Sequence, residues 1–210
     1  MKTFIMTMAF GLMGLISLAQ DQDPKAKAIL DELSKKTKGY TSLEVEFTMK
    51  TVNKTENVNE SFTGKAKMKG NKYTVDLGKQ KILCDGVKIW TLLIKEKECH
   101  ESLVEDAEDD ALNPTKMLTI WEKGFKFRLV KDENGIQEIN LVPTNPGKAK
   151  YHTVVVKVDK AKQQVKTVIV KGKNGDVTTL EVTKFTPNIG VEDTDFKFNK
   201  KDYPGYTVID

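Results

Sequence analysis

From Ser42 onward, apolar residues recur at every second position in short runs that turn residues separate. In the run Leu43–Met49, for example, every odd-numbered residue is apolar. Because successive side chains of a strand point to opposite faces of a sheet, this alternation predicts strands with one buried and one solvated face. Dipeptides such as Gly70-Asn71 and Asn174-Gly175 are typical of tight turns between strands. The pattern predicts about ten antiparallel strands joined by hairpins.

Two segments begin with the signals of helices instead. Asp23-Pro24 and Asn113-Pro114 each place a capping side chain before a proline, which suits the first helical position. The first helix is expected to end at Gly39, and the second, shorter one at Gly124. Before the second helix, Glu101–Asn113 is acidic with no basic residue, which favours an exposed loop or a frayed helix.

The apolar face of the predicted sheet needs a cover. Phe196 and Phe198 are expected to form its last strand, and two short helices cover little of a sheet this large. The sheet could close into a barrel, pack as two sheets, or curl into an open half-barrel with helices over its mouth. Only the half-barrel leaves a sizeable apolar cavity, and the residues alone leave a lined cavity and a packed core equally open.

Residues 1–19 have the features of a secretory signal peptide. Lys2 is the only charge before Asp21, Phe4–Ala19 is almost wholly apolar, and small residues stand at both positions that a signal peptidase reads. An apolar run of about 16 residues is shorter than the roughly 20 that a spanning helix needs. We therefore expect cleavage after Ala19, export from the cytoplasm, and a single domain over residues 20–210.

The charge pattern argues against nucleic acid as a partner. The chain has 34 basic and 30 acidic residues, a net charge of +4, and Arg128 is its only arginine. Nucleic-acid-binding proteins use arginine for bidentate contacts, whereas the lysines here alternate with apolar residues, as in Thr153–Val158. Such lysines are typical of a solvated sheet face.

The residues that carry most enzyme chemistry are scarce. The chain has two histidines and two cysteines and no nucleophile elbow, phosphate loop or metal-ligand motif, so we expect no enzymatic activity, no cofactor and no metal. In a simple meander, Cys84 and Cys99 lie on strands that flank Val87–Ile94, roughly 9–10 Å apart. A disulfide needs Cα atoms within about 7 Å, so two free, buried thiols are expected.

Several short segments together resemble the segments of a known protein family, although each motif alone is too common to indicate it. In chain order they are Ala28-Ile29-Leu30, Tyr40-Thr41-Ser42, Glu46-Phe47-Thr48-Met49-Lys50, Phe62-Thr63-Gly64, the hairpin from Ile82 to Trp90, Asn113-Pro114 with Met117-Leu118, Leu141-Val142-Pro143, and Phe196-Lys197-Phe198. In this order and after a signal peptide, they resemble the outer-membrane lipoprotein carrier family (LolA) over nearly the whole mature sequence.

The resemblance implies a mainly β fold, an open antiparallel half-barrel of about ten to eleven strands with short helices covering the concave apolar face. It implies a periplasmic carrier that shields lipoprotein acyl chains between the inner and the outer membrane. The implied partners are those acyl chains, an inner-membrane lipoprotein-releasing ABC transporter and an unidentified outer-membrane acceptor, and the carrier is expected to be a monomer. The implied lipid-binding residues of cavity and lid are Phe47, Met49, Phe62, Ala66, Met68, Tyr73, Trp90, Leu92, Met117, Leu118 and Trp121.

Two alternatives remain open at this point. The same fold could carry another amphiphile, such as a glycolipid or a phospholipid, or it could serve a lipid-sensing regulatory protein. The sequence also departs from proteobacterial members of the family, which have a lid-latching arginine near the end of the second strand. This chain has Lys69 there, a point charge without the planar guanidinium fork.

Overall fold

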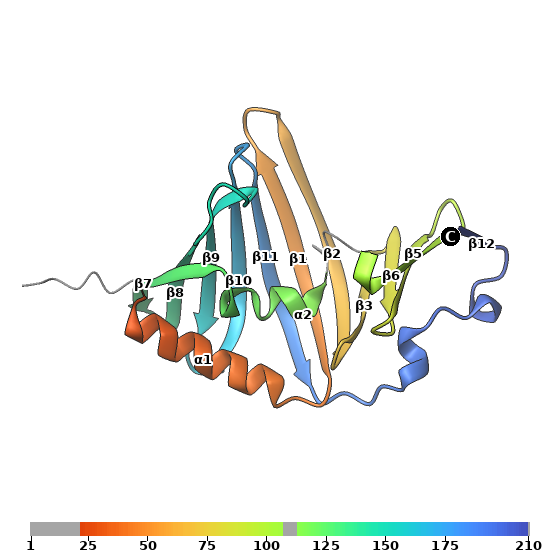
Figure 1. Ribbon diagram of the computed structural model, residues 1–210, viewed down its shortest axis with the longest axis horizontal. Coiled ribbons are helices and arrows are strands. Elements are labelled where there is room, and N and C mark those ends of the chain that lie inside the picture. The colour runs from red at the N-terminus through yellow and green to blue at the C-terminus, as the bar shows by residue number, and fades with distance from the viewer. Residues whose placement is uncertain (1–21, 107–112, 210) are drawn as a thin grey trace, which may run out of the picture.

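The computed structural model describes residues 22–106 and 113–209. The predicted signal peptide and residues 107–112 of the acidic segment lie outside the described residues. Within them, twelve strands form one sheet in the order β12-β6-β5-β4-β3-β2-β1-β11-β10-β9-β8-β7 (Figure 1). The strands are β1 (Leu43–Asn53), β2 (Val58–Lys69), β3 (Lys72–Asp76), β4 (Gln80–Cys84), β5 (Lys88–Leu93), β6 (Glu98–Leu103), β7 (Phe125–Glu133), β8 (Ile136–Pro143), β9 (Tyr151–Asp159), β10 (Gln164–Gly172), β11 (Val177–Pro187) and β12 (Thr207–Ile209).

The sheet is open, with β12 and β7 at its two edges, so the prediction of an open, mainly β fold is confirmed. All pairs are antiparallel except β12 with β6, which is parallel. The helical elements are α1 (Pro24–Lys38), α2 (Pro114–Met117) and the 3-10 turns η1 (Val104–Asp106), η2 (Ile120–Glu122), η3 (Asp193–Phe196) and η4 (Lys200–Asp202). In the described part of the chain, no helix is long and apolar enough to cross a membrane.

Helix α1 begins where the cap signal predicts. One carboxylate oxygen of Asp23 accepts hydrogen bonds from the backbone N–H groups of Lys25 and Ala26, and the other accepts one from Leu129 of β7 at 3.0 Å. These bonds, the one from Leu129 above all, lower the pKa of the Asp23 carboxyl. The cap thus starts the helix and also fixes its N-terminal end to the sheet edge.

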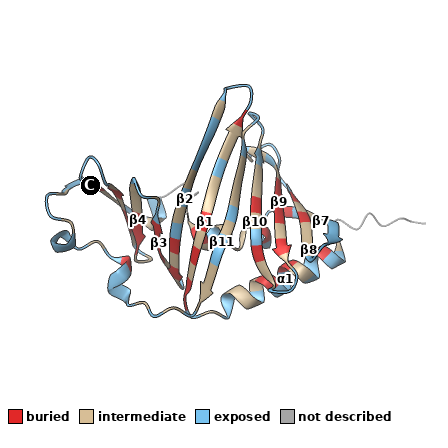
Figure 2. Cartoon of the chain, turned by 180° about the vertical axis from the view of Figure 1, so that it is seen from behind, coloured by how far each residue is buried: buried red, intermediate tan, exposed pale blue. Residues whose placement is uncertain are grey.

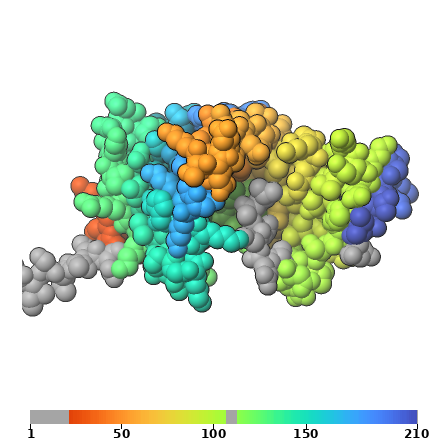
Figure 3. Space-filling model, turned by 90° about the horizontal axis from the view of Figure 1, so that it is seen from above, coloured from red at the N-terminus to blue at the C-terminus, as the bar shows by residue number. Residues whose placement is uncertain are grey.

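The buried residues form three clusters. The first lies between α1 and β7–β10, with Leu30 and Leu33 of the helix packed on the strands. The second lies on the concave face of β1–β5, and the third on the opposite face of β4–β6. Figure 2 shows buried residues in two parts of the sheet, the half that contains β7–β10 and the half that contains β1–β6. Seen from above, the orange segment of β1 and β2 stands between the teal segments on one side and the yellow and lime segments on the other (Figure 3).

The expected last strand at Phe196 and Phe198 is wrong. Phe196 ends η3, which a reciprocal pair of hydrogen bonds between Glu192 and Asp195 caps, and the chain then runs over the outer face of β4–β6 to β12. Two apolar residues at alternating positions are too short a signal to outweigh such a cap. The structure therefore has twelve strands within the described ranges, and its last one is Thr207–Ile209.

The acidic segment is also more ordered at its start than expected. Glu101–Leu103 belongs to β6 and not to a loop. Glu101 accepts hydrogen bonds from Lys88 and from the indole N–H of Trp90, so its charge is paired on the sheet. The second helix begins at Asn113-Pro114 as predicted but lasts only four residues before the chain turns into η2.

Candidate functional site

An apolar cavity of about 40 Å³ lies beneath α2, on the concave face of the sheet. Strands β1, β2, β3, β10 and β11 form its floor and walls, and α2 with the residue after it forms its roof (Figure 1). Every described residue that lines it is apolar: Val45, Phe47, Met49, Ala66, Met68, Val75, Pro114, Met117, Leu118, Val165, Val168, Leu180 and Val182. Nothing in this lining attracts a charge or a metal ion, so the cavity suits an apolar group.

Strand register brings these side chains to one face. Met49 of β1 lies opposite Phe62 on β2 and opposite Leu180 on β11, so these three side chains share one face of the sheet. A bulge in the β9–β10 pairing shifts the register after Val165, so that Val165 and Val168 both line the cavity although they stand three positions apart, an odd spacing. The cavity therefore depends on strand pairing that joins distant parts of the chain.

The roof begins with a well-formed cap and ends with an anchor. The side-chain oxygen of Asn113 accepts hydrogen bonds from the N–H groups of Thr115 and Lys116. After α2, Trp121 is 3% exposed and its indole N–H donates to Ser34 Oγ of α1 at 2.8 Å. Between cap and anchor, Leu118 packs against both large core clusters. Leu118 is thus the side chain through which the roof contacts both halves of the sheet.

A second, open space adjoins the cavity. This groove of about 310 Å³ lies between the C-terminal end of α1, the link to β1, and α2 with η2. Met68 and Leu118 line the cavity and the groove alike, so these two side chains form the wall between them. The groove lining is Thr37, Lys38, Tyr40, Thr41, Ser42, Leu43, Met68, Gly70, Thr115, Leu118, Thr119 and Glu122.

The structure brings together six of the eleven residues that the sequence predicts as lipid-binding. Those that line the cavity are Phe47, Met49, Ala66, Met68, Met117 and Leu118. Phe62 and Tyr73 belong to the same core cluster without lining the cavity, and Trp121 packs in the cluster under α1. The sequence analysis does not identify the lining residues from β10 and β11, which are Val165, Val168, Leu180 and Val182. Their alternation predicts strands, but only the fold shows that β11 lies beside β1.

Trp90 and Leu92 lie apart from the cavity. They point to the outer face of β5, where they form the third cluster with Leu83, Cys99 and aromatic residues of the C-terminal segment. Their neighbour Ile89 points to the concave face, as period two requires. The aromatic residues that cover this outer face are Phe198, Tyr203 and Tyr206.

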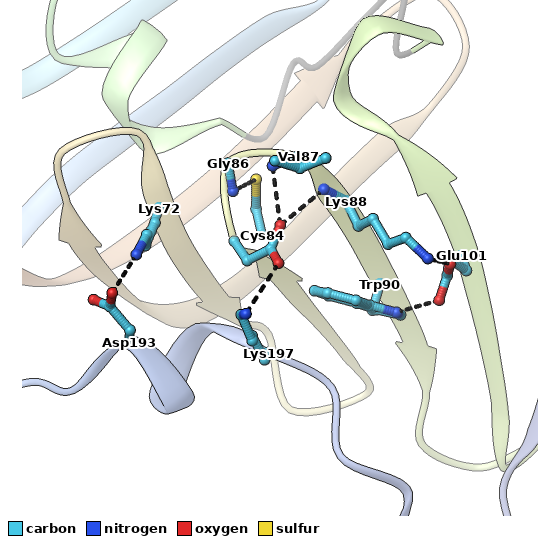
Figure 4. A network of polar contacts seen from close by, with 10 residues as sticks. Lys72, Cys84, Gly86, Val87, Lys88, Trp90, Glu101, Asp193 and Lys197 are labelled. Carbon is cyan, nitrogen blue, oxygen red and sulfur yellow. Dashed lines mark hydrogen bonds and ion pairs between the residues drawn. The ribbon is translucent and has the colours of Figure 1, made fainter.

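Ion pairs hold the C-terminal segment on this outer face. The carboxylate of Asp193 accepts hydrogen bonds from Lys69 at 3.0 Å and from Lys72 at 2.6 Å, and the second contact is drawn in Figure 4. The two lysines, Lys72 first, lower the pKa of Asp193 from 3.8 to about 2. Lys69 therefore contacts the C-terminal segment in this structure.

Among the described residues neither cysteine forms a disulfide, and both are buried, as the sequence predicts. The Cys84 sulfur accepts a hydrogen bond from the N–H of Gly86 at 3.4 Å. Burial raises the pKa of the Cys99 thiol from 9.0 to about 11, so this thiol is not an activated nucleophile. Among residues 22–106 and 113–209, no group of three or more histidine, cysteine or acidic side chains is placed to hold a metal ion.

Comparison with known proteins places this geometry in a family. Residues 38–199 match the family model described as outer membrane lipoprotein carrier protein LolA. No curated protein sequence matches the chain. Among solved structures, an uncharacterized conserved protein from Thermus thermophilus has a TM-score of 0.56 at 15% identity, over 88% of this chain and 98% of that one, which shows a shared fold.

Other solved structures are more distant. Lipoprotein LppX from Mycobacterium tuberculosis has a TM-score of 0.48 at 14% identity, over 81% of this chain and 100% of that one. A putative outer membrane lipoprotein-sorting protein domain from Vibrio parahaemolyticus has a TM-score of 0.46 at 15% identity, over 84% of this chain and 97% of that one.

Proposed function

The chain belongs to the LolA family of outer membrane lipoprotein carrier proteins, and from that premise we propose that it is a non-enzymatic carrier of lipoprotein acyl chains. The observation that carries the proposal is the cavity beneath α2, which the described part of the chain lines with apolar side chains alone. An acyl chain in this cavity would gain about 0.8 kcal/mol for each methylene group removed from water.

The carrier function requires the cavity to widen. Its volume of about 40 Å³ is far smaller than the roughly 300–1,000 Å³ typical of ligand pockets. An incoming chain must therefore push α2 and the side chains beneath it apart. Three of the lining residues are methionines, Met49, Met68 and Met117, and unbranched thioether side chains change rotamer readily. The roof that has to move is a helix of only four residues.

The proposal includes a route. The chain would be exported with its signal peptide removed after Ala19 and would act as a monomer in the periplasm. There it would accept lipoproteins from an inner-membrane ABC transporter and deliver them to an outer-membrane acceptor. The resemblance described above supports these partners.

A charge placed in the roof tests the proposal. Leu118→Glu would put a carboxylate against both core clusters and the cavity, and burying that charge opposes an apolar ligand. We expect the variant to lose binding of a fluorescent fatty acid such as cis-parinaric acid. Val130→Glu adds the same charge at a residue that is 42% exposed on the edge strand β7, and it should bind the probe as the unaltered protein does. Equal binding by both variants would contradict the cavity as the binding site.

A further inference from the structure

The groove beside the cavity is chemically unlike it. The cavity lining is wholly apolar, whereas hydroxyl-bearing side chains line much of the groove: Thr37, Tyr40, Thr41, Ser42, Thr115 and Thr119. The two spaces meet at Met68 and Leu118. An apolar cavity that adjoins a groove bearing hydroxyl groups matches the two ends of an amphiphile, an apolar chain and a head that forms hydrogen bonds.

One hydroxyl in this groove is left without a partner. Thr115 Oγ1 is buried and makes no hydrogen bond with any described residue. By contrast, Ser42 Oγ donates to the carbonyl of Ile189 at 2.6 Å, and Thr119 Oγ1 donates to the carbonyl of Thr115 at 2.8 Å. A buried polar group without a partner costs about 1–3 kcal/mol. A ligand atom that accepts or donates a hydrogen bond at Thr115 would remove that cost.

The charged side chains of the groove neutralise each other. Lys38 and Glu122 are the charged residues among the described side chains that line it, and their Nζ and Oε1 atoms lie 2.8 Å apart. Lys38, as the main cause, lowers the pKa of the Glu122 carboxyl, which therefore stays ionised near neutral pH. An anionic headgroup would have to displace this carboxylate from the lysine and would meet like-charge repulsion.

We propose that the groove binds the uncharged, hydrogen-bonding head of an amphiphile whose acyl chain passes between Met68 and Leu118 into the cavity. The inference rests on the proposed carrier function and restricts the class of lipid that is carried, because lipids with a phosphate head are disfavoured. The glyceryl-peptide head of a lipoprotein and the sugar of a glycolipid share the chemistry that the groove recognises. With a volume of about 310 Å³, the groove is several times larger than the cavity of about 40 Å³ beside it.

Headgroup competition on the full mature chain tests this inference. Four competitors with one palmitoyl or hexadecyl chain would displace a bound fluorescent fatty acid: palmitoylglycerol, a palmitoylated S-glyceryl-cysteine peptide with both termini capped as amides, hexadecyl glucoside and palmitoyl lysophosphatidylglycerol. We expect the uncharged heads to compete about tenfold better than the phosphate head. A tenfold ratio corresponds to the free energy of about one hydrogen bond, which the phosphate head would lose to repulsion from Glu122. A preference for the peptide over the glucoside would assign the head to a lipoprotein, and the reverse preference to a glycolipid.

Two variants connect the preference to the groove. Thr115→Val keeps the shape but removes the unpartnered hydroxyl, and it should reduce the advantage of the uncharged heads over the phosphate head several-fold. Glu122→Gln frees Lys38 and should improve competition by the phosphate-headed lipid several-fold. Thr63→Val, at an exposed position of β2, is the matched control and should change neither value.

The outcomes distinguish failure of the head site in the groove from failure of the carrier function. If all four competitors bind equally well, or if Thr115→Val and Glu122→Gln leave the order of heads unchanged, the groove is not the head site although the cavity still binds chains. If the phosphate head competes best, the charge argument is overturned. If neither the fatty-acid probe nor any competitor binds, the carrier function itself fails, and the head site fails with it.

Discussion

The ring of Phe47 lies across Gly64, its cross-strand partner, so closely that a Cβ atom at position 64 would stand 2.5 Å from the ring Cζ. Leu77 approaches the same point, with its Cδ2 atom at 2.9 Å. Because Gly64 has no side chain, the Phe47 ring settles against the strand and leaves space above it. The absence of one methyl group therefore sets the depth of the cavity floor.

Gly64→Ala should raise that floor. The added methyl group would push the Phe47 ring toward α2 and fill part of the cavity, at a cost of about 1–3 kcal/mol in the free energy of unfolding. We expect weaker binding of cis-parinaric acid together with a lower melting temperature. Gly190→Ala is the control, because a Cβ atom there meets nothing within 4 Å. An alanine at position 64 that bound the probe as glycine does would show that Phe47 does not limit the cavity.

The long β1–β2 hairpin depends on one buried amide. Asn53 is 1% exposed, accepts hydrogen bonds from the N–H groups of Thr55 and Glu56, and donates to Asn174 O and to Asp176 Oδ1. Asn53→Ala would leave these groups without partners and should lower the free energy of unfolding by about 1–3 kcal/mol. Urea unfolding measures this, with Asn59→Ala at an exposed position as control. Equal midpoints for the two variants would contradict the role of Asn53.

Most of the fold follows from local signals. The Asp23-Pro24 and Asn113-Pro114 caps, the Asp85-Gly86 turn and the alternation of Leu43–Met49 each predict an element that the structure contains. The path of residues 188–209 is not predictable in this way, because ion pairs such as Lys72 with Asp193 hold it on strands more than a hundred residues earlier. Such long-range pairing leaves no periodic trace in the sequence.

The candidate site, too, is predictable from the sequence only where local patterns determine it. Alternation alone predicts that Phe47 and Met49 share a face, but it does not say which face of β5 is concave. The family resemblance assigns Trp90 to the cavity, whereas one step of register places it on the outer face. The contributions of Leu180 and Val182 follow from the pairing of β1 with β11, which joins opposite ends of the chain.

Acid should loosen the C-terminal segment only at very low pH. Lys72 and Lys69 depress the pKa of Asp193 to about 2, so the stabilisation from these pairs is complete above the ordinary value of 3.8 and is lost as the pH falls through about 2. In a carboxyl NMR titration, Asp193 should show a midpoint near 2, and Lys72→Met should move it upward toward 3.8. A midpoint near 3.8 in the unaltered protein would contradict the observed pairing.

Neither thiol should react in the native protein. Cys99 is 0% exposed and Cys84 1% exposed, and burial raises the pKa of Cys99 to about 11. At pH 8, Ellman's reagent should therefore detect thiols only after urea unfolding, when both cysteines react. Rapid reaction in native protein would show that the strands around the second cluster, for Cys84, or around the third cluster, for Cys99, open readily.

The central claim is that the apolar cavity carries the acyl chains of lipoproteins. The most direct measurement is native mass spectrometry, followed by lipid extraction, on the full chain purified from the periplasm without detergent. The account predicts bound lipoproteins that detergent releases and that Leu118→Glu no longer retains. Extracted glycolipid or phospholipid would keep the cavity but contradict its cargo. Protein that is empty under every condition would contradict the carrier function altogether.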